Sequence, residues 1–201
     1  SHFYDIFRYQ ILDTNSYIEE IWAYGYWAID RCARIIKEGA SFKEVTKGDL
    51  TEVEGCIAQA YAIKALCSFY LTNMFGLPYS EANKTTLGIV NVTEPVPAYS
   101  QVSRVSVEQN YSLILDDITK AKEYYAKEGV ENVGKQYMNT AAVAALEARV
   151  KLYMKNYEGA ITAAQEAITL SGGTIVSTKE DYKNMYTTLA CLLYTSPSPR
   201  D

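Results

Sequence analysis

The chain has 201 residues, a net charge of −5 and a sequence pI near 5.1, with 48% hydrophobic and 21% charged residues. This composition is that of an ordinary globular domain, and it excludes a disordered or fibrous chain. The acidic balance and the lack of a Lys/Arg cluster argue against nucleic-acid binding. The sequence has no run of about 18 apolar residues, so no segment is expected to span a bilayer.

The first predicted helix covers residues 18–37. Its large apolar side chains recur at steps of three and four residues, which is the period of one helix face. They are Trp22, Tyr26, Ile29, either Cys32 or Ala33, and Ile36. Gly39 is predicted to end the helix, because glycine readily adopts the left-handed conformation found just after a helix C-terminus. Residues 1–17 are aromatic and irregular, and we expect a loop or a truncated helix there.

A second helix is predicted from about Glu52 to Phe75. Thr51, followed three residues later by Glu54, fits a capping box at its start. Apolar residues cover so much of the circumference that the helix should be mostly enclosed. Glycine and proline follow Phe75 and end the helical pattern. Residues 77–103 then form a long predicted loop, a kind of connection that is usually functional or well packed.

The third predicted helix opens at Ser106 and continues to about Lys127, with Gln109 completing a capping box. Its apolar residues step by four, three, four, three and four positions, which indicates one buried helix face. They are Val107, Tyr111, Ile114, Ile118, Ala121 and Tyr125.

Residues 139–170 are predicted to form two helices joined by a short turn. Alanines recur along both, and small residues at such spacing let helices approach closely. They are Ala142, Ala145 and Ala148, then Ala160, Ala164 and Ala167. In the second helix Ile161 and Ile168 extend the predicted buried stripe, and Ser171-Gly172-Gly173 is predicted to end it. Such a hairpin cannot bury its apolar face alone, so similar neighbours are needed. The sequence therefore predicts an all-α fold of tetratricopeptide-like helical hairpins with a long loop insertion.

Candidate catalytic side chains are few. His2 is the only histidine of the chain, which nearly excludes catalysis by an imidazole. Asp116 and Asp117 are adjacent, but consecutive helical residues point about 100° apart, so they are predicted to be solvated or capping residues. No phosphate loop and no Cys/His spacing typical of a metal site is present. We therefore expect neither an enzyme nor a bound cofactor or metal.

Four blocks of the sequence resemble one family. The run from Arg104 to Ala121 is similar to the R-x-[ST]-V-x-[EQ]-x-Y-x-x-I-x-x-D-[LI]-x-x-A segment of SusD/RagB-type proteins, which are outer-membrane nutrient-binding lipoproteins of Bacteroidota. Three other blocks resemble further motifs of that family. Residues 22–29 resemble its W-x-x-x-Y-x-x-I helix, residues 64–79 its R-A-L…YGxxP stretch, and residues 139–153 its A-L-L-A-R-V-Y-L-Y helix. Lys64 replaces the usual Arg of the second motif, and no departure removes an apolar seam.

The resemblance implies a helical-repeat scaffold that binds oligosaccharides, or sometimes peptides, without catalysis and caps a TonB-dependent SusC-like transporter. It also implies attachment to the outer membrane through an N-terminal lipidated cysteine that this fragment lacks. Much of the ligand site is expected in a C-terminal region absent here. Tyr4, Arg8 and Tyr9 are the local candidates for ligand binding, and a packing or surface role is the alternative for each.

Domain boundaries follow from the same patterns. Residues 1–190 are predicted to be one SusD-like helical-repeat region truncated at both ends, and residues 191–201 a non-native tail, because they continue no pattern. The alternative function is an intracellular tetratricopeptide-type adaptor whose concave face binds a peptide. A signal peptide ending in a lipidated cysteine in the complete gene would favour the nutrient-binding reading.

Overall fold

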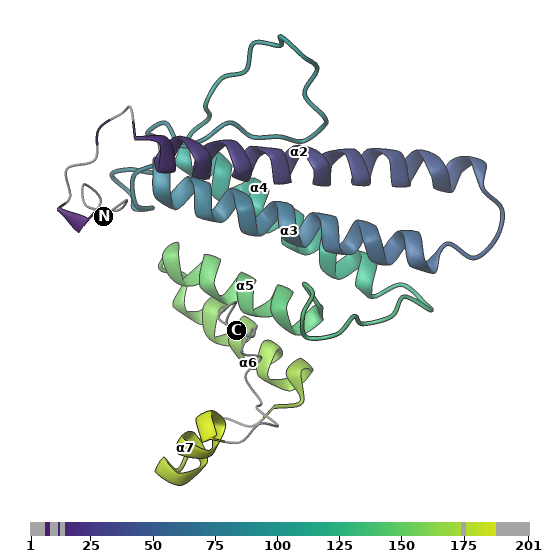
Figure 1. Cartoon of the computed structure of the whole chain (residues 1–201), viewed down its shortest axis with the longest axis vertical. Coiled ribbons are helices and arrows are strands. Elements are labelled where there is room, and N and C mark those ends of the chain that lie inside the picture. Colours follow the sequence, from purple (N-terminus) through teal and green to yellow (C-terminus); the bar gives the residue numbers. More distant parts are fainter. Residues whose placement is uncertain (1–6, 9–11, 13–14, 174–175, 188–201) are drawn as a thin grey trace, which may run out of the picture.

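The computed structural model describes residues 7–8, 12, 15–173 and 176–187, and the fold is all-α. The described helices, in chain order, are α2 (Ser16–Val45), α3 (Thr51–Phe75), α4 (Val107–Tyr125), α5 (Thr140–Tyr153), α6 (Tyr157–Ser171) and α7 (Lys179–Thr187). From α2 to α6 each helix packs against the next one along the chain, whereas α7 lies apart from the stack (Figure 1). This stack of helices confirms the predicted all-α helical-hairpin fold.

The first helix is longer than predicted. Asn15 caps it by accepting hydrogen bonds from the backbone N–H groups of Tyr17 and Ile18, and the helix continues through Gly39 to Val45. The predicted stop at Gly39 is therefore wrong. A Cβ at Gly39 would lie 2.8 Å from Cδ1 of Ile57, so this glycine permits the close approach of α2 and α3.

The predicted capping box of α3 is also wrong. Leu50 occupies the N-cap position and makes no side-chain cap hydrogen bond. Glu54 instead accepts from Lys43 at 2.5 Å and from Lys127 at 2.6 Å, which ties the α2 and α4 ends to α3. These ammonium groups, Lys127 foremost, hold the pKa of the Glu54 carboxyl below its usual range. The predicted end of α3 at Phe75 is confirmed.

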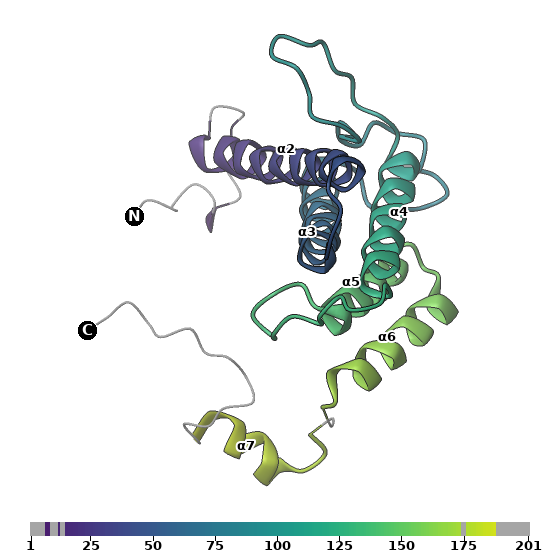
Figure 2. The same cartoon turned by 90° about the vertical axis from the view of Figure 1, so that its right-hand side faces the viewer.

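Helix α3 lies at the centre of the molecule, between α2 and α4 (Figure 2). Its buried residues are Ile57, Ala58, Ala60, Ala62, Lys64, Ala65, Ser68, Phe69, Leu71 and Thr72. The prediction that α3 is mostly enclosed is confirmed for these residues. It is wrong for Tyr70 and Met74, which are 45% and 58% exposed. One apolar cluster joins α3, α4 and α5, and a second joins α2, α3 and the loop that follows α3.

Helix α4 forms as predicted. The Ser106 hydroxyl accepts from the backbone N–H of Gln109 while the Gln109 side chain accepts from the backbone N–H of Ser106, so both halves of the capping box are present. All six residues of the predicted apolar stripe are buried. The prediction succeeds because the cap and the stripe are both local features of the sequence.

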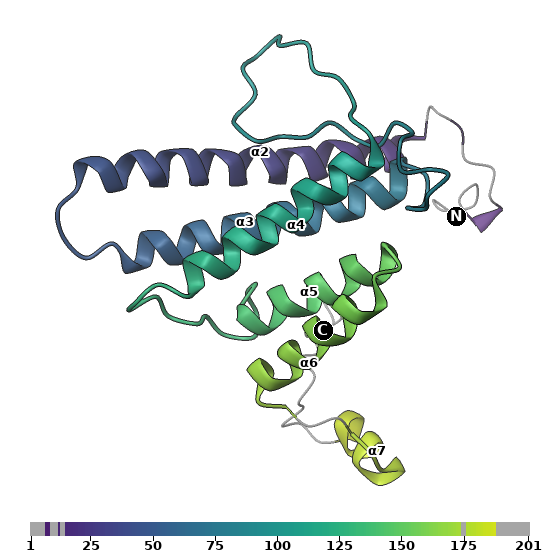
Figure 3. The same cartoon turned by 180° about the vertical axis from the view of Figure 1, so that it is seen from behind.

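The hairpin of α5 and α6 is confirmed, but the predicted buried face of α6 is only partly correct. Of the predicted stripe, Ala160 is buried, whereas Ile161 and Ile168 are 59% and 43% exposed. Ala163, which was not part of the predicted stripe, is buried. Helix α6 packs against α5 (Figure 3). Gly172, with φ of 61°, ends the helix as predicted.

Candidate functional site

The connection from residue 76 to residue 106, here called the α3–α4 loop, projects from the helical stack (Figure 1). Within this loop, residues 87–89 pair with residues 105–106, and backbone hydrogen bonds join the two segments. Gly88 N–H donates to the Val105 carbonyl at 2.7 Å, and Val105 N–H donates to the Ile89 carbonyl at 3.0 Å. An isolated antiparallel bridge pairs Leu87 with Ser106. The loop therefore leaves and re-enters the stack through a fixed neck.

Arg104 fastens this neck to the end of α3. Its Nη2 atom donates to the carbonyl oxygens of Phe75 at 3.1 Å and Leu87 at 3.0 Å, and its Nε atom donates to the Gly88 carbonyl. Phe75 is the last residue of α3, where carbonyl groups lack helical partners. One guanidinium thus joins its own side of the neck to the end of α3 and to the Leu87–Gly88 side.

Polar side chains of the helices hold residues 89 and 90, just after the neck. Each side chain hydrogen-bonds to both the N–H and the carbonyl of one residue, as a neighbouring strand would. Asn110 of α4, only 1% exposed, accepts from Ile89 N–H at 2.8 Å and donates to the Ile89 carbonyl at 3.1 Å. Tyr26 of α2 accepts from Val90 N–H at 2.9 Å and donates to the Val90 carbonyl at 3.1 Å. A Cβ at Gly88 would lie 1.9 Å from Oδ1 of Asn110, so glycine is needed there.

Lys64 holds Val92, two residues beyond Val90, and forms a buried ion pair. Its Nζ atom donates to the Val92 carbonyl at 3.2 Å and lies 3.0 Å from Oδ1 of Asp117. The prediction that Asp117 is solvated or caps a helix is therefore wrong. Burial raises the pKa of Asp117 to about 6, and the Lys64 charge opposes that rise. The other carboxylate oxygen, Oδ2, is buried and has no hydrogen-bond partner among the described residues.

The tip of the α3–α4 loop is exposed and contains a strained turn. Ser100 N–H donates to the Pro97 carbonyl at 3.2 Å, which closes a turn, and Tyr99 has φ of 64° within it. Positive φ is costly for a residue other than glycine, asparagine or aspartate. The Tyr99 side chain is fully exposed. A fixed neck and the clamped residues 89–92 thus carry a solvent-facing aromatic ring.

Other aromatic side chains reach solvent from the helices. On α2, the rings of Tyr24 and Trp27 meet edge to face with centroids 5.2 Å apart, and both are more than half exposed. Tyr70 of α3 and Tyr153 of α5 both contact the buried ring of Phe69. Arg149 Nη1 donates to the Tyr70 hydroxyl at 3.1 Å.

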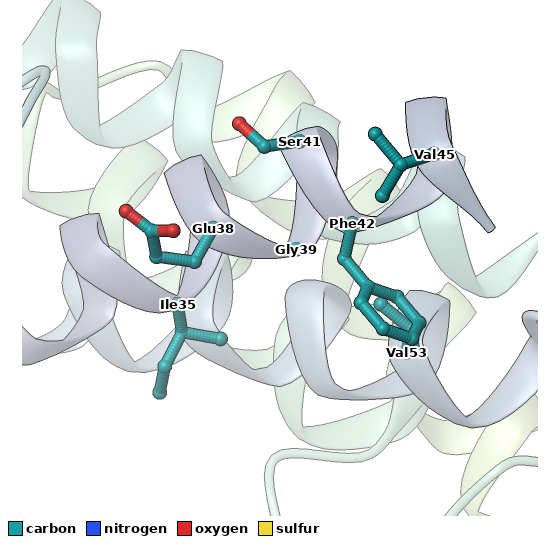
Figure 4. A pocket seen from close by; sticks show the side chains of 7 residues that line it. All are labelled: Ile35, Glu38, Gly39, Ser41, Phe42, Val45 and Val53. Carbon is teal, nitrogen blue, oxygen red and sulfur yellow. The ribbon is translucent and has the colours of Figure 1, made fainter.

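An apolar groove lies towards the C-terminal end of α2, with a volume of about 620 Å³ (Figure 4). Its lining residues are Ile35, Glu38, Gly39, Ser41, Phe42, Val45 and Val53. Figure 4 shows the Phe42 ring reaching towards Val53 of the neighbouring helix. Convergent polar groups, which orient a hydrophilic ligand, are few here, so this groove is a poor sugar site.

The ligand residues predicted from the sequence stay a prediction, because only one of them belongs to the described part of the chain. Arg8 is exposed, while Tyr4 and Tyr9 lie outside the described residues, as does the predicted tail 191–201. Among the described residues, no group of three or more His, Cys, Asp and Glu side chains is arranged to hold a metal ion.

Sequence reasoning missed the residues that hold the α3–α4 loop. Asn110, Lys64 and Asp117 are polar, yet each stands in an otherwise apolar helix face, and a buried polar residue needs a partner. A polar residue within an apolar helix face was therefore the sequence feature that could have indicated these contacts. It reveals that a partner exists but not which distant segment supplies it.

Comparison with protein families decides the identity of the fold. Residues 3–152, well over half of the chain, match the SusD-like family that is described as starch-binding and associating with the outer membrane. The chain belongs to the SusD-like family. The resemblance of its four sequence blocks to SusD/RagB-type proteins is thereby confirmed. A comparison with curated proteins finds no match.

Solved structures agree with this SusD-like assignment. A SusD superfamily protein from Bacteroides thetaiotaomicron is 28% identical, with a TM-score of 0.70 over 82% of this chain and 35% of that chain. A SusD superfamily protein from Bacteroides fragilis, 20% identical, has a TM-score of 0.72 over 93% of this chain and 42% of that chain. A laminarin binding SusD-like protein, 18% identical, has a TM-score of 0.62 over 84% of this chain and 35% of that chain. The last two, at such low identity, support the fold alone.

The SusD-like chain described here spans 35% of the length of its Bacteroides thetaiotaomicron relative. None of its described helices combines the length and the apolar character that crossing a bilayer requires.

Proposed function

We propose that this chain is the helical-repeat part of a surface-exposed protein that binds oligosaccharide nutrients and delivers them to a SusC-like TonB-dependent transporter. The observation that carries the proposal is the match of residues 3–152 to a family described as starch-binding and associating with the outer membrane. A laminarin binding SusD-like protein has the same fold, so laminarin is one of the polysaccharides to test. The proposed role is binding without catalysis.

The surface chemistry of the chain supports sugar binding. A tyrosine ring offers a flat apolar face and a hydrogen-bonding tip, and it loses little conformational entropy when it is fixed by a ligand. The 18 tyrosines of the chain supply several such rings. Half-exposed or fully exposed aromatic side chains include Tyr24, Trp27, Tyr70, Tyr99 and Tyr153. We also propose that Tyr4, Arg8 and Tyr9 contribute to the complete ligand site.

Membrane attachment is proposed to occur through a lipidated cysteine that precedes this chain in the complete protein. A lipid anchor needs no membrane-spanning helix and places the helical repeats outside the membrane. In this arrangement the repeats lie over the transporter and keep bound oligosaccharide close to its entrance, which raises the local ligand concentration.

Affinity electrophoresis tests the binding half of the proposal. The full chain is run under native conditions in gels that contain laminarin or amylopectin, with bovine serum albumin as the reference. We expect retardation in at least one of the two gels, and its reversal by soluble oligosaccharide of the same linkage. Unchanged mobility in both gels, supported by a flat calorimetric titration, would contradict sugar binding.

Cross-linking tests the transporter half. The affinity-tagged lipoprotein is purified from cross-linked outer membranes of the producing bacterium, and its partners are identified by mass spectrometry. We expect a SusC-like transporter in stoichiometric amount. If the purified lipoprotein binds sugar fully but no transporter is recovered with it, the proposed delivery to a transporter is wrong and only the sugar-binding role stands.

A further inference from the structure

We infer that Tyr70, Arg149 and Tyr153 form an oligosaccharide-binding subsite on the face where α3 and α5 meet. This inference rests on the proposed function and deepens it, because it names a subsite and the chemistry by which a sugar would be recognised.

The two tyrosine rings are held in place from behind. The ring of Phe69, which is 2% exposed, lies 6.1 Å from the Tyr70 ring and 5.1 Å from the Tyr153 ring, centroid to centroid. Tyr70 and Tyr153 are themselves 45% and 50% exposed. Each ring therefore packs on the core and still presents a large part of its surface to solvent, which suits stacking against the apolar face of a pyranose ring.

Arg149 adds hydrogen-bond donors beside these rings. It lies one helical turn before Tyr153 on α5, so both side chains share one face of that helix. Its Nη1 atom donates to the Tyr70 hydroxyl at 3.1 Å, and within the part of the chain that the structure describes this is its hydrogen-bond partner. A guanidinium carries five N–H donors in a planar fork, so several remain for adjacent ligand oxygens.

The support behind the subsite is rigid. Asn73 Nδ2 donates to the Phe69 carbonyl at 2.7 Å, and the Tyr111 hydroxyl donates to Oδ1 of Asn73 at 3.2 Å. The Tyr111 ring, which is 1% exposed, meets Phe69 edge to face with centroids 6.2 Å apart. Side chains that are already ordered lose less entropy when a ligand binds, and this lowers the cost of association.

Two other exposed surfaces of the described chain differ from this one. The groove along α2 is lined by apolar side chains apart from Glu38 and Ser41. The Tyr24–Trp27 pair of α2 has the exposed Arg31 one helical turn further on, but among the described residues no hydrogen bond joins that guanidinium to either ring. At Tyr70 and Tyr153, in contrast, both rings pack on a buried ring and a guanidinium is hydrogen-bonded to one of them.

The ligand class is an oligosaccharide with one pyranose ring against Tyr153 and two neighbouring oxygen atoms on Arg149. Those oxygens belong either to vicinal hydroxyl groups or to the carboxylate of a uronic acid. Laminarin and amylopectin supply the first chemistry, and polygalacturonate supplies the second, so the three probes separate the two sources.

Titration calorimetry of the full chain with each probe tests the subsite. We expect Arg149→Gln and Tyr153→Leu each to weaken binding about tenfold, because hydrogen bonds to a charged group and an aromatic stacking contact each contribute on that scale. Tyr137→Leu is the matched control, because Tyr137 is 53% exposed and lies near the opposite end of α5. Its affinity should stay within about twofold of the wild-type value.

Footprinting of the wild-type chain gives a second measurement that does not depend on how a variant folds. Hydroxyl-radical labelling with and without the bound probe should show protection of Tyr70 and Tyr153 but not of Tyr137. If the wild type binds a probe while both variants retain its affinity, or while Tyr70 and Tyr153 stay unprotected, the subsite is wrong and the proposed function stands. If the wild type binds none of the probes, the proposed function fails and the subsite fails with it.

Discussion

Replacing the buried Lys64–Asp117 pair with apolar residues should remove a pH-dependent contribution to stability. The two side chains are only 3% and 4% exposed, and burial raises the pKa of Asp117 from its ordinary 3.8 to about 6. A shift of about two pKa units corresponds to about 3 kcal/mol. The folded protein therefore keeps a proton at Asp117 that the unfolded chain loses between about pH 4 and 6. Consequently the free energy of unfolding falls by about 3 kcal/mol as the pH rises through that window.

The informative variant is Lys64→Met combined with Asp117→Leu, which roughly conserves side-chain volume. Subtracting its unfolding free energy from that of the wild type cancels the titration of the other carboxylates. The wild type should gain about 3 kcal/mol relative to the double variant when the pH is lowered from about 7 to about 4. The Val92 carbonyl also loses its donor in the variant, but this loss does not titrate and cancels from the pH dependence.

Urea unfolding followed by far-UV circular dichroism measures both free energies across this pH range. Lys64→Met alone serves as the control, and leaving the Asp117 carboxyl without its cation should cost about 3 kcal/mol near pH 7. A difference curve that stays flat with pH would show that Asp117 titrates at its ordinary value. A difference that grows in the opposite direction would show that Lys64 lowers the pKa more than burial raises it.

Three further substitutions probe the contacts that shape the fold. Asn110→Ala leaves the Ile89 N–H without its acceptor, while the Ile89 carbonyl keeps the Val105 N–H. It should cost about 2 kcal/mol in urea unfolding and speed hydrogen exchange at Ile89, whereas the exposed cap residue Gln109→Ala should cost about 1 kcal/mol. Gly39→Ala should lower the Tm despite the better helix propensity of alanine, because its Cβ would meet Ile57 at 2.8 Å; a higher Tm would disprove the close approach. Tyr99→Asn should stabilise the protein by about 1 kcal/mol relative to Tyr99→Val, because asparagine tolerates positive φ; equal denaturation midpoints would argue against the left-handed turn.

Features encoded within a few residues were predictable from the sequence. The cap and stripe of α4 and the glycine stop after α6 depend on residues that are neighbours along the chain. The predicted helix end at Gly39 is wrong because a glycine can either end a helix or allow a neighbouring helix to approach closely. The contact with Ile57 on α3 shows that the second role applies here, and this contact cannot be read from the local sequence. Thr51 and Glu54 matched a cap pattern, but Lys43 and Lys127 supply stronger partners for the carboxylate.

The candidate site was harder to predict, because its contacts join distant segments. Tyr26 was placed correctly on the packed face of its helix, yet nothing near it in the sequence indicates that its hydroxyl holds Val90. Tyr70 and Tyr153 likewise come together only through the packing of α3 and α5 around Phe69. The family resemblance identified the scaffold, and the side-chain geometry identified which exposed rings stand beside a guanidinium.

The clamping of residues 89–92 by three different helices makes the loop beyond them separable from the stack. Tyr26, Lys64 and Asn110 fix this segment without any contribution from the turn around Tyr99. Since lengthening a loop whose ends are already joined costs little closure entropy, the tip should accept inserted sequence well. A short foreign peptide placed between Ala98 and Tyr99 would be displayed on an intact helical scaffold, which makes this position a natural grafting point for protein engineering.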